Sequence, residues 1–123
     1  DKEVVFLKNI NENLKLALIK SSNLFLMPTR IEKKSVEGFG ISFMEAASYG
    51  VGSIGGKDGG ASDAITHNKT GLICNGNELS SISDAVNQYF SKDQFVKFGI
   101  EAKKLSENFH WNKVVKKYLK LIN

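Results

Sequence analysis

The sequence predicts an α/β fold with a parallel sheet of about four strands and a helical C-terminal tail, and two observations lead to this fold class. Short apolar runs suited to buried strands alternate with segments whose apolar residues recur at helical spacing. A strand, helix, strand order implies a right-handed crossover and therefore parallel strands. The chain has 123 residues, 41% of them apolar, which is enough for one domain with its own core.

The N-terminal part of the chain predicts two strands with a helix between them. Val4 to Leu7 (VVFL) is a short apolar run rich in β-branched and aromatic residues, which we interpret as a buried strand. Asn11 is suited to cap a helix that ends near Ser21. Leu24 to Met27 (LFLM) is the next strand, and it ends at Pro28 because proline has no N–H to donate to a strand ladder.

The rest of the chain continues this alternation and then becomes helical. We expect, in chain order, a helix, a strand, a glycine-rich loop, a short helix, a strand and three helices: Ile41 to Tyr49, Val51 to Ile54, Gly55 to Gly60, Ala61 to Ile65, Gly71 to Cys74, Leu79 to Phe90, Asp93 to Ser106, and Trp111 to Ile122. The tail helices each carry an apolar stripe, which indicates that they pack on the sheet or on each other.

The stretch from Gly50 to Gly55 spells GxGxxG, the dinucleotide-binding fingerprint. That fingerprint follows a strand and opens a helix. Here a predicted helix precedes the glycines and the predicted strand Val51 to Ile54 runs through them. We therefore reject a dinucleotide site.

Composition and charge exclude several classes of function. The net charge of +4 comes largely from tail lysines that do not interleave with aromatic residues, so we expect no nucleic-acid binding. A solvated helix face and a peripheral contact with anionic lipid remain alternatives for this tail. No apolar run approaches the roughly 20 residues of a membrane span, and the single Cys74 excludes an internal disulfide. His67 and His110 stand apart from other ligand types, so we expect no metal site.

Two glutamates lie on either side of a glycine turn, and they are the strongest functional signal in the sequence. Glu37 precedes Gly38-Phe39-Gly40, and Glu45 lies within the helix predicted from Ile41 to Tyr49. The amides of Phe39, Gly40 and Ile41 would be the unpaired donors at the start of that helix, where the helix dipole also favours an anion. A phosphate group is the expected ligand.

Residues on both sides of this motif could complete an anion site. Arg30 lies in a basic loop after the strand Leu24 to Met27, at the carboxyl end where open α/β sheets bind ligands. The alternative is that Arg30 is a solvated loop charge. The glycine pairs Gly55-Gly56 and Gly59-Gly60 lack β-carbons, so their backbone could approach a ligand closely.

These residues resemble the nucleotide-sugar-binding core of the retaining glycosyltransferases of family 4, which have two Rossmann-like domains in the GT-B architecture. The chain departs from the family at Gly52, where proline is usual, and we expect this change to loosen the turn into the next strand. The positions that match the family pattern are Glu37, Gly38, Phe39, Gly40, Ile41, Glu45, Ala46, Gly50, Gly59, Gly60 and Asp63.

The resemblance implies that residues 1–123 form a single truncated donor-binding domain with a partial Rossmann-like, doubly wound sheet. The N-terminal acceptor domain and the first strands of the C-terminal domain would be absent from the chain. Leu24 to Met27 would then lack its usual neighbour, so we expect either that Val4 to Leu7 pairs beside it or that a second chain covers the edge. A homodimer could also form through the last helix, Trp111 to Ile122.

The resemblance also implies the reaction. A sugar would pass with retention from a nucleotide-diphosphate sugar to a hydroxyl acceptor in glycan, capsule or glycolipid synthesis. Glu37 would be the catalytic residue that holds the transferred sugar, and Glu45 would hold the ribose hydroxyls. Fixed dipoles would stabilise the departing diphosphate, so no metal or other cofactor is expected. The other donor-binding residues would be Arg30, Gly38, Phe39, Gly40, Ile41, Gly59 and Gly60.

The substrate and the setting are further expectations of this resemblance. The basic loop Thr29 to Val36 indicates GDP-mannose as the donor, because it is similar to the mannosyltransferase branch. We expect a cytoplasmic protein, and a place at the inner face of the membrane remains an alternative for it. Two alternatives remain: a nucleotide-sugar epimerase of the same architecture, and an inactive folded fragment that binds no ligand measurably.

Overall fold

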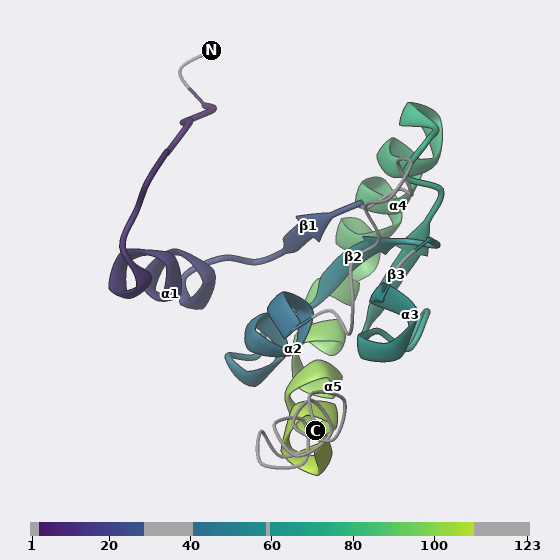
Figure 1. Cartoon of the computed structure of the whole chain (residues 1–123). Coiled ribbons are helices and arrows are strands. Elements are labelled where there is room, and N and C mark those ends of the chain that lie inside the picture. Colours follow the sequence, from purple (N-terminus) through teal and green to yellow (C-terminus); the bar gives the residue numbers. More distant parts are fainter. Residues whose placement is uncertain (1–2, 29–40, 59, 110–123) are drawn as a thin grey trace, which may run out of the picture.

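The computed structural model of the chain describes residues 3–28, 41–58 and 60–109, and it confirms the α/β fold class. The sheet has three parallel strands in the order β1-β2-β3 (Figure 1). The elements are α1 (Glu12–Lys20), β1 (Phe25–Met27), α2 (Ile41–Ser48), β2 (Ser53–Gly56), α3 (Ala61–Ala64), β3 (Gly71–Cys74), α4 (Leu79–Phe90), the 3-10 turn η1 (Ser91–Asp93) and α5 (Gln94–Phe109). The predicted helix Trp111 to Ile122 lies outside the described residues.

The sheet has a buried layer on each face, because successive strand residues point to opposite sides. Leu72 of β3 packs on one side with Tyr89 of α4 and Phe98 of α5. On the other side, Ile73 packs in the layer that contains Phe43 of α2 and the buried residues of α3. Helices therefore cover both faces, as a doubly wound sheet requires.

The prediction of a strand from Val4 to Leu7 is wrong. These four residues form no strand, and their side chains are 50–89% exposed. Figure 1 shows this segment running away from the sheet, beyond α1. Among the described residues, β1 pairs only with β2, so the expected pairing of Val4 to Leu7 beside β1 is also wrong. The strand count is consequently three in the described part of the chain.

The predicted cap of α1 is confirmed. The Asn11 side-chain oxygen accepts a hydrogen bond of 2.8 Å from the Leu14 amide. Near the other end of the helix, Ile19 is buried in a cluster with Ala46 and Val51. These contacts attach α1 to α2 and to the entry of β2.

Gly52 makes room for a tyrosine rather than loosening the turn into β2. A β-carbon at Gly52 would lie 2.6 Å from the Tyr89 hydroxyl and 2.9 Å from the Phe98 β-carbon. Tyr89 is fully buried and donates a hydrogen bond of 2.8 Å to the Asn23 carbonyl. The turn is packed tightly, and the Gly52 carbonyl accepts a hydrogen bond of 3.0 Å from the Phe25 amide.

The central strand lies two residues further along the chain than the sequence predicted. Gly55 and Gly56 belong to β2 and pair with Ile73 and Cys74, although we expected them to start a loop. A β-carbon at Gly55 would lie 2.6 Å from the β-carbon of Ala61. The missing side chain at Gly55 therefore allows α3 to pack on the strand.

Candidate functional site

The helix α2 carries the part of the predicted site that the structure describes. The structure describes it from Ile41, and Glu45 lies one turn later. Because α2 connects the parallel strands β1 and β2, its N-terminus lies toward the carboxyl edge of the sheet. That edge is where open α/β folds bind ligands.

Gly60 is the other predicted donor-binding residue that the structure describes. It is buried and precedes α3, where its carbonyl accepts a hydrogen bond of 3.1 Å from the Asp63 amide. Lys57, just after β2, donates from its amide to the Cys74 carbonyl over 2.8 Å. The start of this glycine-rich loop is thus tied to the carboxyl end of β3. The remaining predicted site residues lie outside the described residues: Arg30, Glu37, Gly38, Phe39, Gly40 and Gly59.

Glu45 is the charged residue in an otherwise apolar stretch of α2. Its neighbours Phe43, Met44, Ala46 and Ala47 are 0–4% exposed, whereas the Glu45 side chain is 18% exposed. A carboxylate in such surroundings loses much of its hydration, so it needs a compensating partner. Glu45 is therefore a candidate for a role other than packing.

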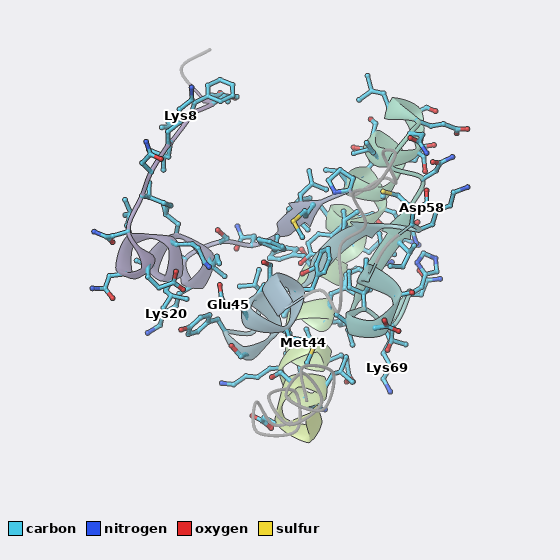
Figure 2. All side chains as sticks on the ribbon, viewed as in Figure 1. Lys8, Lys20, Met44, Glu45, Asp58 and Lys69 are labelled. Carbon is cyan, nitrogen blue, oxygen red and sulfur yellow. The ribbon has the colours of Figure 1, made fainter. Side chains whose placement is uncertain are left out.

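The partner of Glu45 is Lys15 of α1, which the sequence analysis missed. The Lys15 Nζ lies 3.2 Å from Glu45 Oε1 and 3.3 Å from Glu12 Oε1. Oε1 of Glu45 is fully shielded from solvent, and the Lys15 ammonium compensates its charge as an ion pair. Glu45 raises the pKa of Lys15, partial desolvation opposes this shift, and Glu12 adds to it. Figure 2 shows Glu45 on the side of α2 that faces α1.

Other features of the described residues lie away from this site. A hollow of about 420 Å³ is lined by Asn68, Lys69, Gln88, Gln94, Lys97, Phe98 and Glu101. Asn68 and Lys69 precede β3, so this hollow is at the amino edge of the sheet. Within residues 3–28, 41–58 and 60–109, no three metal-ligating side chains gather, and no helix is long and apolar enough to cross a membrane.

Curated relatives of this chain are glycosyltransferases. The chain is 35% identical over 100 residues to the GDP-mannose-dependent alpha-(1-6)-phosphatidylinositol monomannoside mannosyltransferase of Mycobacterium tuberculosis, an alignment that covers 78% of this chain and 26% of the relative. It is 32% identical over 122 residues to the glycogen synthase of Treponema denticola, covering 90% of this chain and 23% of that enzyme. The chain therefore spans about a quarter of the length of these relatives.

Solved structures share the fold at low sequence identity. The sucrose-phosphate synthase of Thermosynechococcus elongatus superposes with a TM-score of 0.80 at 18% identity, over 98% of this chain and 30% of that one. Anabaena HepE, solved in complex with UDP and glucose, superposes with a TM-score of 0.69 at 18% identity, over 85% of this chain and 28% of that one. These likenesses establish the arrangement of strands and helices.

The family assignment rests on the sequence itself. The family model described as glycosyl transferases group 1 matches residues 1–110, which is most of the chain. The described sheet and its helices agree with the fold of the GT-B neighbours. This chain belongs to the glycosyl transferases group 1 family.

Proposed function

We propose that the protein carrying this chain transfers a sugar from a nucleotide-diphosphate sugar to a hydroxyl acceptor, and that this chain supplies groups that bind the donor. The observation that carries the proposal is Glu45, a poorly hydrated carboxylate one turn into α2, and the family resemblance implies that this position binds the ribose. A carboxylate can accept two hydrogen bonds from the hydroxyl pair of a ribose. Membership of the glycosyl transferases group 1 supports the same reaction class.

The remaining roles extend the proposal to the residues of the motif. Glu37 holds the transferred sugar, and the amides from Phe39 to Ile41 stabilise the charge that collects on the departing diphosphate. The bond between the anomeric carbon and the diphosphate oxygen breaks, the acceptor oxygen bonds to that carbon on the same face, and the hydroxyl proton leaves with the diphosphate. Arg30, Gly59 and Gly60 complete the contacts to the donor.

We propose GDP-mannose as the donor. The Mycobacterium tuberculosis relative is GDP-mannose-dependent by name and is 35% identical to this chain, whereas Anabaena HepE, solved with UDP and glucose, is 18% identical. The proposed setting is the cytoplasmic face of a membrane, where a basic surface could meet a lipid-linked acceptor. The proposed protein partners are an acceptor-binding domain beside this one, and a second copy against the edge of β1 that pairs with no strand among the described residues.

The test measures donor binding and transfer in the full-length protein. Calorimetry with GDP, UDP, GDP-mannose and UDP-glucose identifies the donor, and we expect the isolated chain to bind weakly because it spans only about a quarter of the length of its relatives. Glu45→Gln should weaken binding of the preferred nucleotide roughly tenfold, since a hydrogen bond to a charged group is replaced by one to a neutral amide.

Glu101→Gln is the matched control. Glu101 also lies on a helix and pairs with a lysine, with 3.5 Å between Lys104 Nζ and Glu101 Oε1. The proposal fails if none of the four compounds binds the full-length protein. It also fails if Glu45→Gln and the control bind the preferred nucleotide equally well.

A further inference from the structure

The contact between α1 and α2 combines a packed apolar pair with an ion pair. Ile19 is buried in a cluster with Ala46, and Lys15 lies one turn before Ile19 on the same face of α1. Glu45 immediately precedes Ala46 on α2 and meets Lys15 at 3.2 Å. The lysine is therefore held beside the carboxylate by a fixed helix contact, unlike an isolated surface pair.

The two oxygens of Glu45 have different surroundings. Oε1 is shielded from solvent and faces Lys15, and no hydrogen-bond partner for it is found in the part of the chain that the structure describes. The exposed 18% of the side chain must therefore belong to its other atoms. If Lys15 were removed, Oε1 would be a buried charge without compensation, and the carboxylate would turn toward water.

We propose that Lys15 is a positioning residue that holds Glu45 in the orientation in which the second carboxylate oxygen, Oε2, receives the ribose hydroxyls of the donor. This inference rests on the proposed function, in which Glu45 binds the ribose of the donor. Lys15 itself touches neither the sugar nor the diphosphate in this proposal. Its effect is to fix one carboxylate oxygen, Oε1, and with it the direction of the other.

Glu12 provides a second test, because its loss should leave ribose recognition intact whereas loss of Lys15 should weaken it. It shares the Lys15 ammonium at 3.3 Å, and its side chain is 66% exposed, so it competes with Glu45 for the same cation. Removing the Glu12 charge leaves Lys15 to Glu45 alone. The positioning role therefore predicts that loss of Lys15 and loss of Glu12 have different effects on ribose recognition, although each breaks an ion pair of the same lysine.

The experiment compares ribose with deoxyribose in the full-length protein. Affinities are measured by calorimetry for GDP and UDP, and then for the 2′-deoxy and 3′-deoxy forms of whichever binds more tightly. In the wild type, removal of a hydroxyl should weaken binding roughly tenfold, because a hydrogen bond to a charged group is lost. In Lys15→Met, removal of the hydroxyl should weaken binding by only about two- to threefold. Lys15→Arg should restore most of the wild-type difference between the ribose and deoxyribose forms. Glu12→Gln should leave that difference equal or make it larger.

Lys20→Met is the matched control, since Lys20 is exposed on the same helix and forms no ion pair with any residue that the structure describes (Figure 2). The inference is overturned if Lys15→Met keeps the full ribose preference, or if Glu12→Gln loses it to the same extent. If the wild type binds its nucleotide without preferring ribose, the assignment of Glu45 fails and the inference fails with it. If neither nucleotide binds, the proposed function itself is wrong.

Discussion

Tyr89 allows a direct test of how the helices are packed on the sheet. Its ring is fully buried and stacks on Phe98 with 5.2 Å between ring centroids, and its hydroxyl donates to the Asn23 carbonyl over 2.8 Å. Tyr89→Phe keeps the ring but leaves that carbonyl without its donor. At neutral pH we expect the free energy of unfolding to fall by about 1 kcal/mol.

The pH dependence of the same variant is the stronger prediction. Burial raises the pKa of Tyr89 from 10.0 to about 12, with a smaller opposing effect from the Gly52 backbone. Below pH 10 the hydroxyl is neutral in both states, so its contribution to stability is complete. Above pH 10 the unfolded chain loses this proton first. Stability then falls by up to about 1.4 kcal/mol per pH unit, and by about 2.7 kcal/mol at most once the folded pKa is passed.

Tyr89→Phe lacks this alkaline loss, so the order of stability should reverse. The wild type should be the more stable protein at neutral pH and the less stable one above roughly pH 10.5 to 11. The measurement is guanidinium unfolding followed by far-ultraviolet circular dichroism, in a Cys74→Ala background because burial also raises the pKa of Cys74. Parallel stability curves for the two proteins from neutral to strongly alkaline pH would refute this account of Tyr89.

The remaining predictions concern a helix contact, a helix cap and the chemistry. Gly99→Ala should lower the free energy of unfolding by about 1–3 kcal/mol in denaturant melts, because a β-carbon there would overlap the Gly50 carbonyl oxygen, although alanine alone would favour the helix; greater stability would contradict this contact. Asn11→Ala should cost about 1 kcal/mol and lower the helix signal of α1 in NMR shifts, whereas Asn13→Ala on the exposed side should not. Transfer by the full-length protein should persist in excess EDTA, since the proposed mechanism uses amide dipoles, and loss of turnover that Mg²⁺ or Mn²⁺ restores would disprove it.

Elements that depend on local pattern were predictable from the sequence. The bounds of β3 and α4 agree with the prediction, and α5 begins within one residue of it. β3 is a short apolar run between turn residues, and α4 has an apolar stripe at helical spacing, so short-range spacing was sufficient. The Asn11 cap is local for the same reason, because its side chain bonds to an amide three residues later.

Elements that depend on a partner were not predictable in this way. Val4 to Leu7 has the composition of a buried strand, but a strand forms only against a neighbour, and β1 does not supply one. Gly55 and Gly56 have low intrinsic strand preference and were expected in a loop. They lie in β2 because they pair with Ile73 and Cys74 of β3, and the bare backbone at Gly55 leaves room for α3, a contact that composition does not reveal.

The candidate site also contains one residue that a local motif identifies and one that only tertiary packing reveals. Glu45 could be identified by its motif, but Lys15 is distant from it in sequence and meets it only after Ile19 has packed beside Ala46. Because α1 has nine residues, it is too short to be stable as an isolated helix and depends on that packing and on the Asn11 cap. If Lys15 orients Glu45, weakening the cap should reduce the preference for ribose only to the extent that α1 unfolds. A ribose preference that stays constant while the helix signal of α1 is lost would separate Glu45 from α1 and leave the motif alone to account for donor binding.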